Sequence, residues 1–212
     1  MENKVQTFKA TKTFRFAERK LEVKQTILFI ALHGYGQLPE FFLRKFQSLP
    51  DNYHLIAPEG PHRFYLQGNS GRVGASWMTK EAREDDISDN LNWLQQLLDH
   101  LMNTNSYQKV ILLGFSQGGA TAARWYFQQP QRFSHLILWS SVFPPDLEKP
   151  SLSDAHPHFF VLGNQDEYYT EEQQKSELEF YKKAGFQTLS FEGKHDIHSD
   201  ALQIILHQIE QQ

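Results

Sequence analysis

Short apolar runs alternate with amphipathic segments along almost the whole chain. The runs have the length of strands, and the one at residues 26–32 is continuously apolar, which is typical of a strand that is covered on both faces of a parallel sheet. They comprise residues 26–32, 53–57, 110–113, 133–139, 158–162 and 186–191. Between them, apolar residues recur at helical spacing, most clearly at Ile87, Leu91, Leu94, Leu98 and Leu101. This order predicts a single α/β domain, residues 1–212, with a mostly parallel central sheet and helices on both faces.

Residues at the ends of the predicted helices support these boundaries. Pro39 suits the first turn of a helix whose apolar stripe ends at Leu49. Thr170 and Gln173 form a capping-box pattern, and Gly185 stops the helix that follows them. Further helices are expected from Asp85 to Leu101, from Gly119 to Gln128 and over Ala201–Ile209 at the C-terminus.

Two segments lack a clear period. Residues 5–16 are rich in β-forming residues and predict a hairpin or edge strands. Residues 59–80 contain four glycines, which predicts an irregular loop, and long loops in compact domains are usually functional. We expect Phe64 and Trp77, two bulky members of this loop, to close a substrate pocket. No part of the loop has the pattern of an amphipathic lid helix.

The composition excludes several classes of protein. Of the 212 residues, 40% are hydrophobic and 22% are charged, and the net charge of −4 gives no reason to expect nucleic acid or an anionic membrane as partner. The absence of cysteine excludes disulfides, thiolate metal sites and a cysteine nucleophile. The chain shows neither a signal-peptide core nor an apolar run of about 18 residues. We therefore expect a cytoplasmic protein that does not insert stably into membranes.

The most specific motif is G-x-S-x-G at residues 114–118, directly after the apolar run of residues 110–113. Between a strand and a helix, this motif is the nucleophile elbow of α/β-hydrolases. The turn is so tight that Gly114 and Gly118 are needed on either side of the serine, whose hydroxyl stands exposed above the sheet. The motif also occurs by chance, but its position here predicts that Ser116 is a catalytic nucleophile.

A serine nucleophile needs a base that takes its proton and a third group that orients the base. In α/β-hydrolases the chain order is serine, then an acidic residue, then histidine. Asp166 and His195 complete this order, because each follows a predicted strand and so reaches the same edge of the sheet as Ser116. We predict the catalytic triad Ser116, Asp166 and His195.

Other residues compete for the two remaining roles. Asp146 and Asp154 lie in a proline-rich connector rather than directly after a strand, and Glu167 would need a different loop turn. His198 lies where the last helix should begin, and Asp196 fits a helix cap or a partner of the histidine. The other histidines show no metal-ligand spacing, so we expect no metal site.

Acyl transfer also needs two N–H donors for the oxyanion of the tetrahedral intermediate. One donor is expected from Gln117, the residue after the nucleophile, and the other from the early loop at residues 33–36. The glycines of this loop let the backbone approach a substrate, and we expect the Tyr35 amide to be the donor. His33, in the same loop, is interpreted as structural.

With these residues, the chain resembles the phospholipase/carboxylesterase family, which includes acyl-protein thioesterases. The resemblance runs from residue 26 to the C-terminal helix. It is carried by H-G-Y-G (33–36), A-P-E-G-P (57–61), S-W (76–77), G-F-S-Q-G-G (114–119), G-N-Q-D (163–166) and H-D-I (195–197). The resemblance implies serine-dependent hydrolysis of carboxylic esters or thioesters without a metal or organic cofactor.

Two departures from the family pattern concern the substrate rather than the triad. The family usually has glycine before the histidine, where this chain has Lys194. After the aspartate the family usually has small apolar residues and proline, whereas Glu167, Tyr168, Tyr169 and Thr170 stand here.

The resulting hypothesis is a serine carboxylesterase that cleaves small ester substrates through an acyl-enzyme. A lysophospholipase or an acyl-protein thioesterase is the alternative within the same chemistry. A non-catalytic binding protein with the hydrolase fold is the alternative of another class. Such a protein need not retain all three triad residue types in order together with both oxyanion segments.

Overall fold

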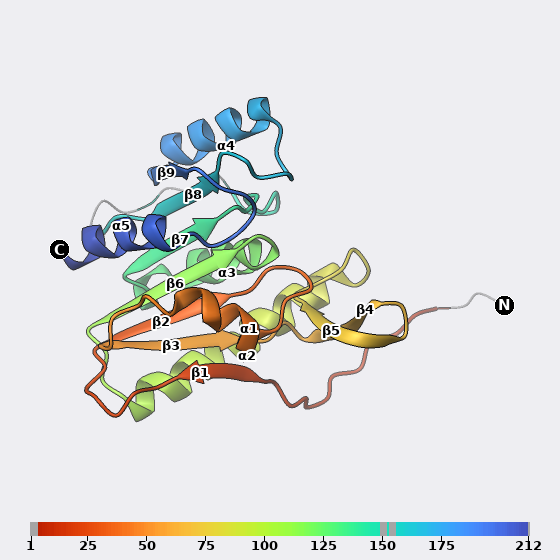
Figure 1. Ribbon diagram of the computed structural model, residues 1–212. Coiled ribbons are helices and arrows are strands. Elements are labelled where there is room, and N and C mark those ends of the chain that lie inside the picture. The colour runs from red at the N-terminus through yellow and green to blue at the C-terminus, as the bar shows by residue number, and fades with distance from the viewer. Residues whose placement is uncertain (1–3, 149–151, 153–155, 212) are drawn as a thin grey trace.

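The structure is organised around a seven-stranded sheet with the strand order β1-β3-β2-β6-β7-β8-β9. The computed structural model describes residues 4–148, 152 and 156–211. The strands of the sheet are β1 (Phe16–Arg19), β2 (Ile27–Leu32), β3 (Tyr53–Pro58), β6 (Lys109–Phe115), β7 (His135–Trp139), β8 (Phe159–Gly163) and β9 (Gln187–Phe191). Every neighbouring pair is parallel except β1 with β3, which confirms the predicted mostly parallel sheet (Figure 1).

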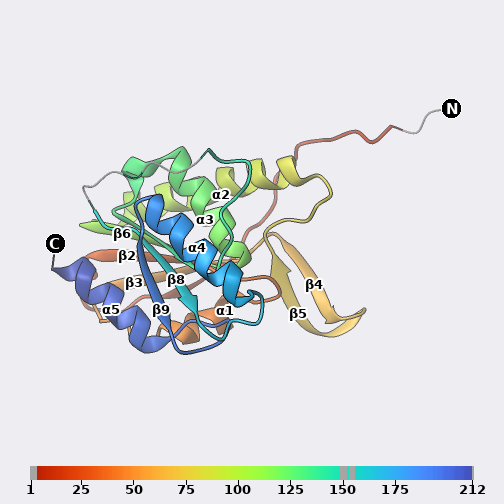
Figure 2. The same cartoon turned by 90° about the horizontal axis from the view of Figure 1, so that it is seen from above.

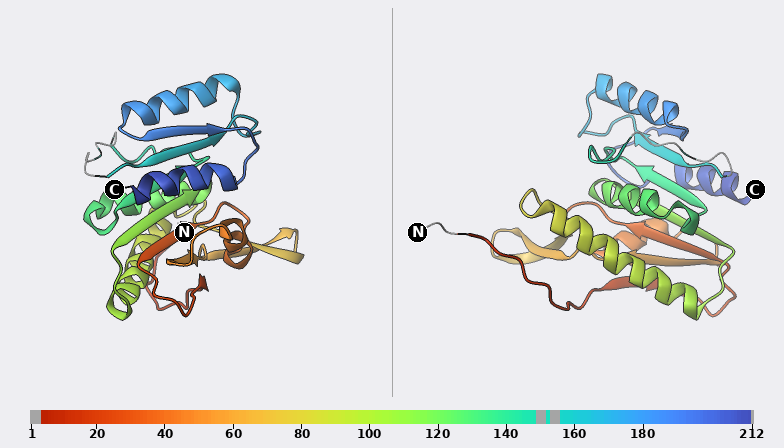
Figure 3. Two further views of the ribbon diagram at one scale, coloured as in Figure 1. Left: turned by 60° about the vertical axis from the view of Figure 1, so that its left-hand side comes forward. Right: turned by 180° about the vertical axis from the view of Figure 1, so that it is seen from behind.

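Helices cover both faces of this sheet. They are α1 (Pro39–Phe42), α2 (Arg83–Thr104), α3 (Gln117–Gln128), α4 (Glu171–Lys183) and α5 (Ser199–Glu210), with 3₁₀ turns η1 (Leu43–Phe46) and η2 (Pro130–Arg132). Helices α2, α3 and α4 pack on one face, whereas α1, η1 and α5 pack on the other (Figure 3). None of the described helices is long and apolar enough to cross a membrane.

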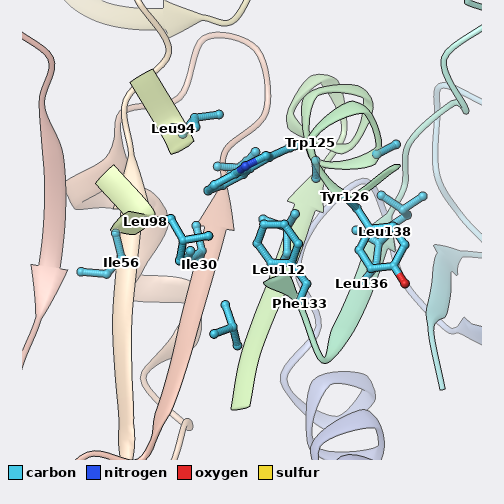
Figure 4. Packing of buried hydrophobic residues seen from close by; sticks show 14 of the residues in the cluster. Ile30, Ile56, Leu94, Leu98, Leu112, Trp125, Tyr126, Phe133, Leu136 and Leu138 are labelled. Atoms are coloured by element: carbon cyan, nitrogen blue, oxygen red, sulfur yellow. The ribbon is translucent and has the colours of Figure 1, made fainter. Parts of the chain in front are cut away.

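The hydrophobic core consists of two layers, one on each side of the sheet. In β2, Ile30 belongs to the layer under α2 and α3, whereas its neighbour Phe29 belongs to the layer under α1 and α5. Figure 4 shows Leu94 and Leu98 of α2 and Trp125 of α3 directed toward the strands of the first layer. Because successive strand residues face opposite layers and both layers are apolar, the central strands have continuous apolar sequences.

The N-terminal segment forms less strand than its sequence predicts. Only β1 is a strand, and it lies at the edge of the sheet; residues 4–15 have no regular structure. Phe16 of β1 pairs with Pro58, the last residue of β3, so the chain before Phe16 extends past the end of its partner strand. Val5 and Phe8, which lie there, are each 93% exposed. The β-forming residues of this segment therefore have no neighbour with which to pair.

The single helix predicted over residues 39–49 is shorter in the structure. One α-helical turn, α1, is followed directly by the 3₁₀ turn η1. The predicted apolar stripe is nevertheless buried at Phe42, Phe46 and Leu49. The guanidinium group of Arg19 in β1 donates to the carbonyl oxygens of Phe46 (3.4 Å) and Leu49 (3.2 Å). A side chain thus bonds carbonyl groups at the end of this segment, where helical carbonyls have no partner within the helix.

The segment of residues 59–80 is not irregular, and that prediction was wrong. It contains an antiparallel hairpin of β4 (His62–Gln67) and β5 (Ser70–Ser76), which stands beyond the carboxyl ends of the sheet strands (Figures 1 and 2). Gly68 lies in the turn and Gly71 is the second residue of β5, with φ angles of +80° and +87°. These glycines break no strand, because they occupy the positions where the turn requires a left-handed backbone.

Two buried histidines lie at the amino ends of β7 and β8. The His158 Nδ1 atom accepts the Leu136 N–H (3.0 Å), and its Nε2 atom lies 3.0 Å from the Tyr126 hydroxyl. The His135 Nδ1 atom lies 2.9 Å from the carbonyl oxygen of Pro157. Burial lowers the pKa of both His135 and His158 to about 4. Both imidazoles are therefore neutral in the folded protein near neutral pH.

We predict that the free energy of unfolding decreases as the pH falls from about 6.5 to about 4. In this interval the histidines of the unfolded chain bind protons, whereas the buried histidines of the folded protein stay neutral. A falling pH therefore favours unfolding. A shift of this size corresponds to about 3 kcal/mol for one histidine. Urea unfolding at several pH values measures the slope, which His158→Asn should reduce and His100→Asn, at an exposed position, should not. Equal slopes in all three proteins would contradict the assignment.

Candidate active site

The candidate nucleophile Ser116 lies between β6 and α3, with backbone angles φ 52° and ψ −120°. A non-glycine residue in such a conformation is strained by about 1–3 kcal/mol, and strain of this kind is concentrated at functional sites. The Ser116 N–H donates to the carbonyl oxygen of Trp139 in β7 (2.9 Å), which ties the turn to the neighbouring strand. The arrangement is the strand–turn–helix geometry of a nucleophile elbow.

The two motif glycines are required by close backbone packing around Ser116. A Cβ atom on Gly114 would lie 2.5 Å from the Cα atom of Gly119 in α3. A Cβ atom on Gly118 would lie 2.4 Å from the carbonyl oxygen of Leu32 at the end of β2. Either side chain would push α3 away from the sheet and release the strained turn.

Asp166 and His195 are brought together from two different loops, which follow β8 and β9. The His195 Nδ1 atom lies 2.7 Å from the Asp166 Oδ2 atom, and the carboxylate is 2% exposed. Its second oxygen accepts the Tyr168 N–H (3.0 Å). The imidazole ring lies between the rings of Phe115 and Tyr168, with centroid distances of 4.8 and 4.5 Å. These contacts fix both the tautomer and the orientation of the ring.

A cavity of about 490 Å³ opens beside the candidate nucleophile. The residues that matter most for its chemistry are Ser116, Gln117, Ser140, Tyr168, Glu177 and His195. The structure thus places the candidate nucleophile and the candidate base on the wall of one cavity, with Asp166 buried behind the base. This is the carboxyl edge of the parallel strands, where ligands bind in folds of this kind.

The competing acidic residues have other partners. Asp146 forms an ion pair with Arg124 of α3 (2.6 Å), and this guanidinium group lowers the pKa of the Asp146 carboxyl to about 2. The exposed Glu167 carboxylate accepts the backbone N–H of His195 (3.4 Å), so it contacts the loop rather than the imidazole. Asp154 lies outside the described residues.

The competing residues near the last helix act as caps or surface contacts. The His198 Nδ1 atom accepts the Ala201 N–H at 3.5 Å at the start of α5, and its ring stacks on Phe191. The Asp196 carboxylate accepts the N–H of the next residue and pairs with Lys45. His198 is the N-cap of the helix, as its position in the sequence indicates.

The backbone N–H groups of Tyr35 and Gln117 are the candidate donors to an oxyanion. A Cβ atom on Gly34 would lie 3.2 Å from the Ser116 Cβ atom, so the early loop directly contacts the elbow. In the described part of the chain, the N–H groups of Tyr35 and Gln117 make no hydrogen bond to a backbone or side-chain acceptor. The Tyr35 side chain is 62% exposed and is not among the residues that line the cavity.

The β4–β5 hairpin holds this early loop in place. The Gly36 N–H donates to the Ala75 carbonyl oxygen (2.8 Å), and the Ala75 N–H donates to the Gln37 carbonyl oxygen (3.2 Å). On the outer side, the Phe64 ring packs on the Tyr35 ring with 5.0 Å between centroids. Phe64 therefore covers the loop from outside and is not among the residues that line the cavity beside the nucleophile.

Trp77 is a buried structural residue and does not line the cavity beside Ser116, so the prediction that it closes the substrate pocket is wrong. Its side chain is completely buried, and its Nε1–H donates to the carbonyl oxygen of His33 (2.8 Å). The His33 ring in turn contacts the carbonyl oxygen of Gly34 (2.8 Å) and accepts the Gly60 N–H (2.9 Å). Burial lowers the pKa of His33 to about 4, so the neutral ring bridges the two loops.

The sequence analysis did not find the wall of the cavity that α4 supplies. Gln173 and Glu177 line it together with Tyr169, which precedes the helix. A signal was present, because Gln173 and Glu177 are four residues apart on the face that carries the buried Tyr181 one turn later. Polar residues on the inward face of an amphipathic helix indicate a site rather than a core position.

The chain is similar to known proteins in sequence and in fold. Residues 12–212 match the model of the Phospholipase/Carboxylesterase family. A probable 1-acylglycerol-3-phosphate O-acyltransferase of Oryza sativa subsp. japonica is 28% identical over 109 residues. That match covers 51% of this chain but only 24% of the relative, so the chain spans about a quarter of that protein's length.

Solved structures show the same fold at low sequence identity. The Bacillus cereus carboxylesterase superposes with a TM-score of 0.69 at 12% identity, over 93% of this chain and 94% of the other. Zea mays acyl-protein thioesterase 2 gives a TM-score of 0.67 at 17% identity, over 93% and 98%. Together with the match over residues 12–212, the fold and the elbow motif establish that the chain belongs to the phospholipase/carboxylesterase family.

Proposed function

We propose that the protein is a serine esterase that hydrolyses small carboxylic esters through an acyl-enzyme. The observation that carries the proposal is the strained Ser116, which shares one cavity with an imidazole held by the buried Asp166. Membership of the phospholipase/carboxylesterase family supports it. A protein that only bound its ligand would have no need for the strain at Ser116 or for the orienting carboxylate.

In the first step, the Ser116 Oγ atom attacks the ester carbonyl carbon while its proton passes to the His195 Nε2 atom. The Nδ1–H of the same ring stays hydrogen-bonded to Asp166 (2.7 Å), which stabilises the imidazolium that forms. The carbonyl oxygen becomes an oxyanion and accepts the N–H groups of Tyr35 and Gln117. Removal of one such donor typically costs about 10²–10³ in kcat.

In the second step, the tetrahedral intermediate collapses and the bond to the leaving alcohol breaks. His195 gives its proton to the leaving oxygen, so the alcohol departs neutral and Ser116 carries the acyl group. A water molecule then repeats the sequence: it loses a proton to His195, attacks the acyl carbon and releases the carboxylic acid. The same residues thus serve acylation and deacylation.

The cavity favours small substrates over long acyl chains. Its volume is about 490 Å³, and its wall includes the polar side chains of Gln173, Glu177 and Ser140. Each methylene that is buried in an apolar groove contributes about 0.8 kcal/mol. The same cavity must also hold the leaving alcohol, so the affinity should stop rising once the acyl chain has filled the remaining space and meets these polar side chains.

We predict that Ser116→Ala lowers kcat by several orders of magnitude, because loss of the nucleophile in a comparable triad costs about 10⁶. The variant should also fail to react with a fluorophosphonate probe, whereas the wild-type protein and the control Ser199→Ala should be labelled. Mass spectrometry of the labelled peptide identifies the residue. A wild-type protein that takes up no probe would favour the non-catalytic binding protein.

Replacement of the two competing histidines should have unequal effects. His195→Ala removes the base and should abolish most turnover, whereas His198→Ala removes only the cap of α5 and should stay within about tenfold of wild type. Steady-state kinetics with p-nitrophenyl acetate measure both, and circular dichroism verifies that both variants are folded. The opposite ranking would transfer the role of base to His198.

Short acyl esters, of about two to six carbons, should be better substrates than chains of twelve or more. The measurement is kcat/KM across a series of p-nitrophenyl esters below their micelle concentrations. An apolar groove would raise kcat/KM about fourfold for every methylene that it buries. A rise that continues through the long chains would contradict this prediction and favour a lysophospholipase or an acyl-protein thioesterase.

A further inference from the structure

The cavity beside Ser116 has a negative rather than a neutral wall. Among the described residues that line it, the ionisable ones are Glu177, His195, Tyr168 and Tyr169, and no lysine or arginine is present. A substrate that enters this cavity therefore meets one carboxylate and no cationic side chain. Negative charge in a cleft with low-dielectric walls attracts cations and repels anions.

Glu177 is the source of this charge, and it has no partner of its own. Within residues 4–148, 152 and 156–211, its half-buried carboxylate makes no hydrogen bond and no ion pair. The next acidic residue of α4, Glu179, differs in this respect because it pairs with Lys183 (3.4 Å). Burial raises the pKa of the Glu177 carboxyl, because the protein does not fully replace the water that solvates the charged form. A cationic ligand would supply the missing partner.

Two tyrosine rings lie in the same cavity as this carboxylate. Tyr168 is 71% exposed and packs edge-on against the His195 ring, and Tyr169 is half buried on the way to α4. Aromatic faces attract ammonium groups through their quadrupole, by about 0.5–2 kcal/mol for each ring. A carboxylate with aromatic neighbours is the chemistry that recognises an alkylammonium group rather than an uncharged alkyl group.

A second hollow, on the other side of the early loop, has the opposite charge. It has a volume of about 400 Å³ and lies between α1 and β5, where Lys45 and Arg72 line it together with Gly36 and Phe42. Lys45 is paired with Asp196, but Arg72 makes no ion pair within the described residues, so a cationic substituent is attracted to the Glu177 side instead. His195 must protonate the leaving oxygen, so the leaving alcohol lies on the part of the Ser116 cavity that is next to His195 and Tyr168.

We infer that Glu177, with Tyr168 and Tyr169, forms a subsite that selects esters whose leaving alcohol carries an ammonium group. The inference rests on the proposed esterase function and adds to it the charge of the substrate. Glu177 acts on substrate binding rather than on the chemistry of Ser116. Its contribution therefore appears in the ratio of kcat/KM between a cationic and a neutral substrate of the same shape.

The test compares choline butyrate with 3,3-dimethylbutyl butyrate, because a trimethylammonium group and a tert-butyl group have nearly the same size and differ in charge. The wild-type protein should prefer the choline ester by at least about tenfold in kcat/KM, which corresponds to about 1.4 kcal/mol. Glu177→Gln should reduce this preference to less than about threefold. Glu177→Asp, which keeps the charge, should retain a larger part of it.

The matched control is Glu172→Gln, which removes an exposed carboxylate from the first turn of the same helix. It should leave both the rates and the preference unchanged. A wild-type preference near one, or a preference that survives in Glu177→Gln, would overturn the inference. An equal loss of preference in Glu172→Gln would also overturn it, because the effect would then belong to the general surface charge.

Binding to the Ser116→Ala variant separates this inference from the proposed function. Isothermal titration with the two esters measures affinity without turnover. A tenfold preference for choline butyrate that disappears in the double variant Ser116→Ala/Glu177→Gln supports the subsite even if the wild-type protein hydrolyses neither ester. Hydrolysis of both esters by the wild-type protein, with equal affinities in the Ser116→Ala variant, supports the esterase and overturns the subsite.

Discussion

The site depends on the contact between the start of α3 and the ends of β2 and β6. The left-handed backbone at Ser116 is unfavourable by itself and persists because its surroundings leave it no alternative. Gly118 brings the helix within contact of the Leu32 carbonyl, and Gly114 brings the strand within contact of Gly119. The same packing starts α3 directly behind the serine, where the Gly119 N–H donates to the Ser116 carbonyl oxygen (2.9 Å) and the Gln117 N–H has no acceptor within the described residues.

The hairpin extends this constraint to the early loop, which carries the second candidate oxyanion donor, Tyr35. The early loop is held by backbone hydrogen bonds between Gly36, Gln37 and Ala75, and Gly74 has no side chain because the Gly36 carbonyl occupies that space, 2.4 Å from a Cβ atom. The Gln117 side chain, at the start of α3, accepts the backbone N–H of Trp77, which directly follows β5 (3.1 Å). The elbow, the early loop and the hairpin thus form one connected unit. This unit holds the candidate donors, the N–H groups of Tyr35 and Gln117, in place before a substrate arrives.

In the proposed function, the residues that act on the ester bond are separate from the residues that select which ester enters. The first group lies at the ends of strands, where parallel pairing brings distant parts of the sequence to one edge. The second group lies on α4 and on the segment before it, where Tyr168 and Tyr169 depart from the family pattern. The carboxylate of Glu177 gives this second group a negative charge. A common mechanism and a particular selectivity are therefore compatible in one cavity.

The sequence by itself determined the parallel sheet, the order of its elements and the candidate triad, because continuous apolar runs and short motifs at strand ends are local signals. Features that depend on a partner distant in the chain were decided by the tertiary structure. Residues 4–15 are not a strand because β3 ends at Pro58, and Trp77 is buried because it bonds to the His33 carbonyl. In the sequence, nothing likewise distinguishes Glu177 from the other polar residues of its helix. Only the packing of α4 beside the loop after β8 places its carboxylate in the cavity with Ser116.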